Sequence, residues 1–138
     1  ERGLFEAAPY AGAEDLLADL HAAGGRVCIA TTKYRPLAQR MLEHFALTPY
    51  IFHAEMSDGT EMSSAKTGML NRTLERSGVA AGRAVMIGDT VFDAEAARDN
   101  GIPFIGVLFG YGTRKEMEEA GATRFVGSLD ELRAELFV

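Results

Sequence analysis

The chain has 138 residues, of which 47% are hydrophobic and 25% are charged, and its formal net charge is −6. This length and composition fit one globular domain with its own core, and the acidic balance excludes nucleic acid as a main partner because no basic stripe is present. No apolar run approaches the roughly 20 residues that a membrane-spanning helix needs, so we expect no membrane partner.

The only cysteine, Cys28, lies within an apolar run and cannot form an internal disulfide. A small buried thiol of this kind is compatible with a reducing compartment. We therefore expect a cytoplasmic protein.

Predicted strands and helices alternate along the chain. In order, these are a lead-in linker over 1–10, a helix over 13–23, a strand over 27–30, a helix from Pro36, a strand over 50–54 and a polar loop over 55–64 with a turn at Asp58-Gly59. They continue as a helix over 64–76, a strand over 84–87, a helix over 90–100, a strand over 102–108, a helix over 113–120, a strand over 124–126 and a helix over 128–136. This alternation predicts the α/β class, a Rossmann-like three-layer sandwich with a parallel sheet.

Residues 84–100 join an apolar strand to a helix through Gly88-Asp89-Thr90. Thr90 and Asp93 have the spacing of a helix N-cap and its third-position acid, which gives Asp93 an ordinary structural explanation. The capping spacing does not explain Asp89. Two carboxylates four residues apart repel one another unless a cation or a hydrogen-bond donor lies between them. Oxygen ligands at the end of a strand suit Mg²⁺.

Two further positions suggest the same edge of the sheet. Thr31 and Thr32 follow the strand over 27–30, and the carboxyl ends of parallel strands meet at one edge. Lys66 falls in the first turn of its predicted helix, where the helix dipole disfavours a cation. A threonine after a strand is usually a turn residue and an exposed lysine costs little, but a lysine directed at bound phosphate would have a function there.

Taken in order, Thr31, Lys66, Asp89 and Asp93 resemble the second, third and fourth motifs of the haloacid dehalogenase superfamily. The surrounding stretches, above all 88–103 and Gly110-Tyr111-Gly112, are most similar to its phosphoglycolate phosphatase-like branch. The resemblance implies a Mg²⁺-dependent phosphatase that acts on a small phosphorylated metabolite, such as a phosphoglycolate-like compound or a sugar or nucleotide monophosphate.

The resemblance also implies a role for each residue. Thr31 would hydrogen-bond a phosphoryl oxygen with help from the backbone at Thr32, and Lys66 would offset charge on the phosphoryl group and the nucleophile. Asp89 would hold Mg²⁺, and Asp93 would support the metal, its water or Lys66. Phosphoryl transfer depends mostly on such positioning and charge neutralisation.

The aspartate nucleophile of the family is not found in the chain. It belongs in an apolar strand followed by x-Asp-Gly-Thr, whereas the similar run Ser57-Asp58-Gly59-Thr60 places Met56 at that position. By the resemblance, the nucleophile strand would lie at the centre of the sheet, between the strands ending at Thr31 and Asp89. We therefore expect this central strand to be absent and the chain as given to be inactive and poorly stable.

The resemblance further implies that residues 1–10 are a linker returning from a missing cap and that 11–138 are the C-terminal part of the core domain. Two alternatives remain open. One is a non-catalytic pseudophosphatase or interaction module on the same fold, and the other is dehalogenase or phosphomutase chemistry. A dehalogenase would not need a metal, so Asp89 favours the phosphatase.

Overall fold

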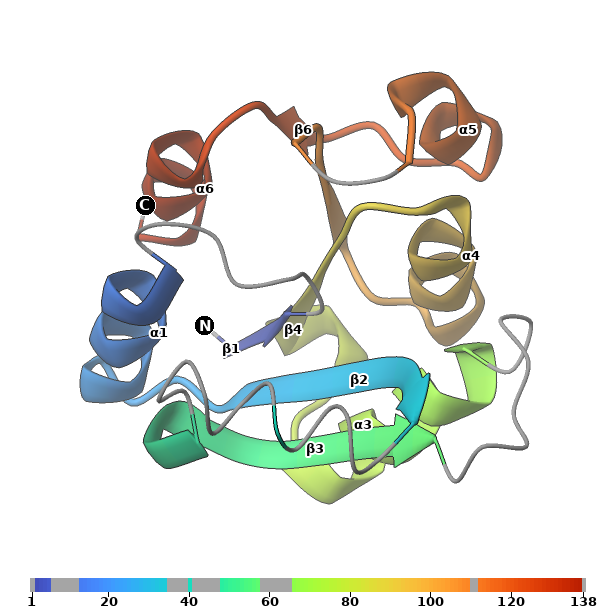
Figure 1. Ribbon diagram of the computed structural model, residues 1–138. Helices are drawn as coiled ribbons and strands as arrows, with labels where there is room; N and C mark the ends of the chain where they lie inside the picture. Colours follow the sequence, from blue (N-terminus) through green and yellow to red (C-terminus); the bar gives the residue numbers. More distant parts are fainter. Residues whose placement is uncertain are drawn as a thin grey trace.

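A parallel six-stranded sheet runs through the computed structural model, in the order β3-β2-β1-β4-β5-β6 (Figure 1). The structure describes residues 2–5, 13–34, 40, 48–57, 66–109 and 112–137. The strands are β1 (Arg2–Phe5), β2 (Val27–Tyr34), β3 (Ile51–Ser57), β4 (Ala84–Gly88), β5 (Phe104–Val107) and β6 (Phe125–Val126). The helices are α1 (Ala13–Ala22), α3 (Lys66–Ser77), α4 (Val91–Asn100), α5 (Arg114–Glu119) and α6 (Leu129–Leu136), with short 3₁₀ turns η1 (Thr48–Tyr50) and η3 (Ala81–Arg83).

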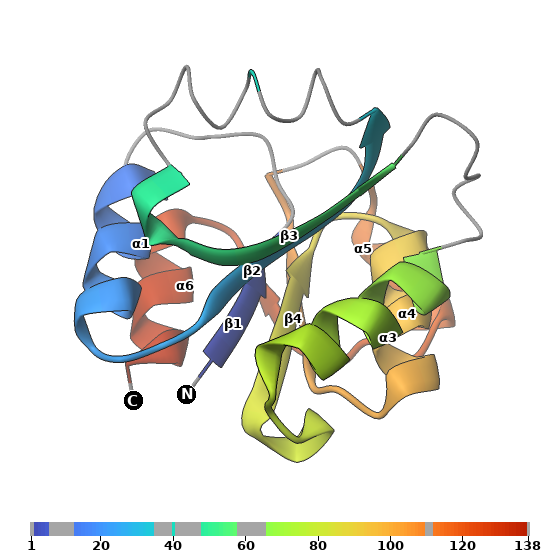
Figure 2. The ribbon, with the colours of Figure 1, turned by 90° about the horizontal axis from the view of Figure 1, so that it is seen from below.

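Helices cover both faces of the sheet. Figure 2 shows α1 and α6 on one side and α3, α4 and α5 on the other. Side chains alternate across β4 accordingly: Val85 and Ile87 belong to the core cluster with α1 and α6, whereas Ala84 and Met86 belong to the cluster with α3 and α4. The predicted three-layer α/β sandwich with a parallel sheet is confirmed for the described residues.

The centre of the sheet differs from the prediction. We expected a vacant position between the strands ending near Thr31 and at Asp89, but β1 lies there, paired with β4 over four residues and with β2 at Leu4. Residues 2–5 of the predicted linker are thus a strand, and the expectation that the central strand is missing is wrong in this respect. Arg2-Gly3-Leu4-Phe5 contains no aspartate, so β1 is not a nucleophile strand.

Local signals placed the ends of several helices correctly. Thr90 forms the capping box that its spacing with Asp93 predicts, Thr113 forms another with Glu116, Ser128 caps α6, and Gly101 ends α4 in the left-handed region at φ 69°. β2 runs past its predicted end at Ala30 to include Thr31 and Thr32, with irregular pairing there. Of the helix predicted from Pro36, the structure describes only Arg40, and the Asp58-Gly59 turn lies outside the described residues.

No helix in the described part of the chain is long and apolar enough to cross a membrane.

Candidate functional site

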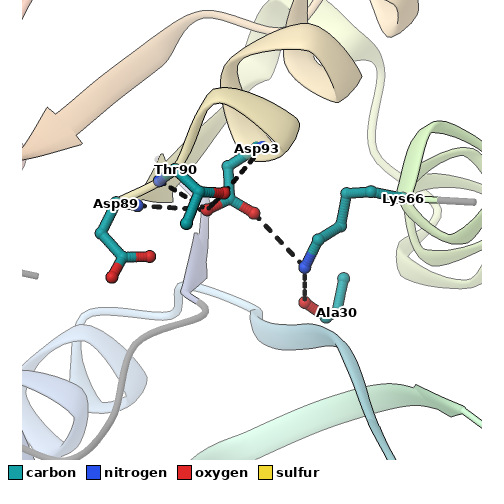
Figure 3. A network of polar contacts seen from close by, with 5 residues as sticks. All are labelled: Ala30, Lys66, Asp89, Thr90 and Asp93. Carbon is teal, nitrogen blue, oxygen red and sulfur yellow. Dashed lines mark hydrogen bonds and ion pairs between the residues drawn. The ribbon is translucent and has the colours of Figure 1, made fainter. Parts of the chain in front are cut away.

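The site centres on a buried ion pair between α3 and α4. Lys66 is the first residue of α3, and its Nζ lies 3.3 Å from Oδ1 of Asp93 in the first turn of α4 (Figure 3). The exposed fractions of the two side chains are only 5% and 1%. Because an unpaired buried charge is costly, removing either side chain would leave the other without its counter-charge.

Asp93 is held from its other oxygen by the turn that precedes α4. Its Oδ2 accepts hydrogen bonds from the backbone N–H of Asp89 (3.1 Å), the backbone N–H of Thr90 (3.1 Å) and the Thr90 hydroxyl (2.9 Å). A Cβ at Gly88 would lie 2.6 Å from Cγ and Oδ2 of Asp93, so only glycine leaves room for this carboxylate. The turn therefore fixes the orientation of Asp93 toward Lys66.

Lys66 also contacts the neighbouring strand. Its Nζ donates a hydrogen bond of 2.9 Å to the carbonyl oxygen of Ala30 in β2. Ala30 directly precedes Thr31, so the ammonium group reaches the backbone beside the predicted phosphate-binding residues. The backbones of Thr31 and Thr32 lie in β2, and their side chains lie outside the structural description.

Asp89 lies at the carboxyl end of β4, directly after Gly88, and is 7% exposed. Figure 3 shows its carboxylate apart from the Lys66–Asp93 ion pair, although its backbone N–H binds Asp93. Its own carbonyl oxygen accepts a hydrogen bond of 2.9 Å from the N–H of Gly112. The structure thus brings Asp89, Asp93, Lys66 and the backbone next to Thr31 to one edge of the sheet.

Two participants are backbone groups that sequence reasoning missed. These are the carbonyl of Ala30, which binds Lys66, and the N–H of Gly112, which binds the Asp89 carbonyl. Every residue except proline has both groups, so side-chain chemistry could not reveal them. The one available signal was the glycine-rich end of the strand over 102–108.

Comparisons with known proteins decide the family. Residues 4–107 match the family described as haloacid dehalogenase-like hydrolase, which is well over half of the chain. The chain belongs to the haloacid dehalogenase-like hydrolase family. The resemblance stated from the sequence motifs is confirmed.

Individual members of this hydrolase family support the same assignment. The chain is 34% identical over 131 residues to a phosphoglycolate phosphatase of Caulobacter vibrioides, covering 89% of the chain and 52% of that protein. It is 32% identical over 134 residues to a 5'-nucleotidase of Pseudomonas aeruginosa, covering 95% of the chain and 59% of that protein. A predicted phosphatase from Clostridium acetobutylicum has a similar structure, with a TM-score of 0.84 and 34% identity over 93% of the chain and 59% of that protein. The chain spans about half the length of the curated relatives it matches.

Proposed function

We propose that this chain is the core-domain part of a Mg²⁺-dependent phosphatase that hydrolyses a small phosphorylated metabolite. The reaction would pass through an aspartyl-phosphate whose aspartate is not in this chain. The observation that carries the proposal is the buried Lys66 ammonium, held between Asp93 and the Ala30 carbonyl beside Asp89. The two relatives are named for phosphoglycolate and for nucleotides, so the proposal extends to both kinds of phosphate monoester.

Each residue has a distinct proposed role. Lys66 offsets negative charge on the phosphoryl group, since its ammonium is fixed in place before substrate arrives. Thr31 and the backbone at Thr32 hydrogen-bond phosphoryl oxygens from within β2. Asp93 orients the Lys66 ammonium, and Asp89 is the proposed metal ligand.

The donor set fits Mg²⁺. This ion takes one or two carboxylates and completes its shell with water and phosphate oxygens, so it does not need a cluster of three side-chain ligands, and the described residues contain none. Asp93 Oδ1 is buried and accepts no hydrogen bond from the described residues, although it is ion-paired with Lys66. Asp89 would hold the ion, and Asp93 Oδ1 would remain available to support it. When bound, the metal would supply positive charge to the phosphoryl oxygens.

The test uses the complete parent protein and an aryl phosphate as a generic substrate. Phosphate release should require Mg²⁺, and Asp89→Ala should reduce it by at least about 100-fold, the scale expected when a group that stabilises transition-state charge is lost. Asp130→Ala, at an exposed position in α6, is the matched control and should leave the rate unchanged. Full activity in Asp89→Ala would refute the metal assignment. The 138-residue chain alone should show no turnover.

A non-catalytic pseudophosphatase or interaction module is the second candidate. It is favoured by one observation, namely that the strand at the centre of the sheet contains no carboxylate that could act as a nucleophile. The coding sequence upstream of residue 1 discriminates between the two. An apolar strand ending in Asp-x-Asp supports the phosphatase, and its absence supports the non-catalytic protein.

A further inference from the structure

Gly112 lies against the backbone of the proposed metal ligand. Its N–H donates a hydrogen bond of 2.9 Å to the carbonyl oxygen of Asp89. A Cβ at Gly112 would overlap that oxygen and would lie 3.0 Å from Cα of Thr90. The obstacle is backbone, not the end of a flexible side chain, so any side chain at residue 112 must displace the turn that carries Asp89.

Neither side of this contact can move easily. Asp89 directly precedes Thr90, the N-cap of α4, and Gly112 directly precedes Thr113, the N-cap of α5. Both threonines form complete capping boxes with the acid three residues later. The two helices also pack together, since Met117 of α5 and Ala94 of α4 belong to one buried cluster. The contact therefore joins two anchored helix starts.

We propose that Gly112 is a positioning residue that fixes the backbone of Asp89 and thereby the direction of its carboxylate. The inference rests on the proposed function, because it assumes that Asp89 binds the metal. It adds that metal binding depends on the segment before α5, which supplies no metal ligand itself. Groups that orient a ligand from outside the coordination shell typically change metal affinity by about 10- to 100-fold when they are lost.

The first experiment measures metal affinity rather than turnover. Mn²⁺ replaces Mg²⁺ as a paramagnetic probe, and its binding to the complete parent protein is followed by electron paramagnetic resonance. Gly112→Ala should weaken Mn²⁺ binding by about 10- to 100-fold. The matched control is Gly82→Ala, because a Cβ at Gly82 in η3 meets no atom within 4 Å. Its Mn²⁺ affinity should equal that of the wild type.

Failure of this inference is distinguishable from failure of the proposed function. If the wild-type protein does not bind Mn²⁺, or if Asp89→Asn binds it equally well, the proposed metal site is wrong. If the wild type binds, Asp89→Asn does not, and Gly112→Ala binds like the wild type, then only the positioning role of Gly112 is overturned. Thermal unfolding of each variant, recorded without metal, separates a loss of fold from a loss of affinity.

A second measurement needs no variant and remains informative if Gly112→Ala does not fold. The amide signal of Gly112 is followed by nuclear magnetic resonance while Mg²⁺ is added to the wild-type protein. It should shift with the same concentration dependence as the amide of Asp89, whereas the amide of Gly82 should not shift. A Gly112 signal that stays constant while Asp89 responds would overturn the inference.

Discussion

Asp93 uses its two carboxylate oxygens for different purposes. Oδ2 completes the capping box of α4 and binds the turn at Asp89, while Oδ1 faces Lys66. The capping interpretation of this residue is therefore confirmed, and its second oxygen contacts Lys66, while its role in catalysis stays a prediction. A single helix start orients the lysine and holds the backbone of the proposed metal ligand, so these two groups cannot be placed independently.

Replacing Lys66 should destabilise the protein strongly. Lys66→Met keeps the apolar stem but leaves the Asp93 carboxylate buried without its counter-charge. Loss of one partner from a buried ion pair costs about 3–5 kcal/mol, so the free energy of unfolding should fall by that amount. Urea denaturation at neutral pH, followed by circular dichroism, measures it.

Two further variants show whether the uncompensated charge of Asp93 causes the loss of stability in Lys66→Met. Asp93→Asn combined with Lys66→Met removes the uncompensated charge and should recover part of the lost stability. Arg114→Met breaks an exposed ion pair with Glu118 and should cost at most about 1 kcal/mol. Equal effects of Lys66→Met and Arg114→Met would contradict the burial argument.

At the scale of elements, Glu55 connects the edge strand β3 to α3. Its carboxylate lies 3.0 Å from His53 Nε2 and accepts a hydrogen bond of 3.2 Å from Arg72 Nε. Partial burial raises the pKa of Glu55, but the hydrogen bonds with His53 and Arg72 outweigh burial and hold this pKa below its ordinary value. Glu55 is paired in register with Ala30, whose carbonyl binds Lys66, so this contact lies one strand away from the site.

The lowered pKa predicts a pH-dependent stability. In the unfolded chain Glu55 has the higher pKa and binds its proton first, so stability rises with pH across this range. The contribution is therefore present at neutral pH and is lost as the pH falls below the ordinary glutamate pKa of about 4.3 toward the folded value. Glu55→Gln should be less stable than the wild type by about 1 kcal/mol at pH 7 and equally stable at low pH.

Urea unfolding of both proteins at several pH values measures the difference. Glu118→Gln is the matched control, because Glu118 also pairs with an arginine but at an exposed position on one helix. Glu118→Gln should lower the free energy of unfolding by less than Glu55→Gln does at pH 7. A Glu55→Gln deficit that persists unchanged at low pH would show that the carboxylate charge is not its cause.

The elements that sequence predicted well are those set by local chemistry. Helix starts at Thr90, Thr113 and Ser128 were predictable because a cap and its partner lie three residues apart. β1 was not, because Arg2-Gly3-Leu4-Phe5 has no strong strand pattern and its pairing partners lie more than 20 residues away. The polar run after Ala30 was interpreted as the end of a strand, but pairing with β3 resumes at Tyr34.

The same difference between local and long-range signals applies to the candidate site. Lys66, Asp89 and Asp93 were predictable from their order and from the elements that carry them, and the structure brings them together. The contacts that position them come from backbone groups of Ala30 and Gly112, whose proximity depends on the whole sheet. The roles of Thr31 and Thr32 in substrate binding stay predictions.

At the scale of the whole molecule, β1 determines whether the two halves of the sheet form one unit. It separates β2 and β3 from β4, β5 and β6, and it pairs with both sides. The sequence led us to expect a poorly stable chain because this position was thought to be vacant. With β1 in place, we predict instead that the 138-residue chain unfolds in one cooperative transition.

Removing residues 1–5 tests the importance of that strand. The deletion leaves backbone groups of β2 and β4 without their partners in a buried sheet, at a cost of about 1–3 kcal/mol for each group left unsatisfied. The shortened chain should therefore lose its cooperative transition in urea, followed by circular dichroism. Leu4→Pro should act in the same direction, because proline removes an N–H from a central strand.

The control removes the residues that follow α6, beginning with the exposed Phe137. This deletion should leave the cooperative urea transition in place. Hydrogen exchange supplies an independent measurement, since amides of β4 that pair with β1 should be protected in the intact chain and exchange quickly after the deletion. If the deletion changes neither the transition nor the exchange of β4, then β1 is not integral to the sheet. The prediction concerns the 138-residue chain alone, because in the complete parent protein the proposed nucleophile strand would take the position of β1 between β2 and β4.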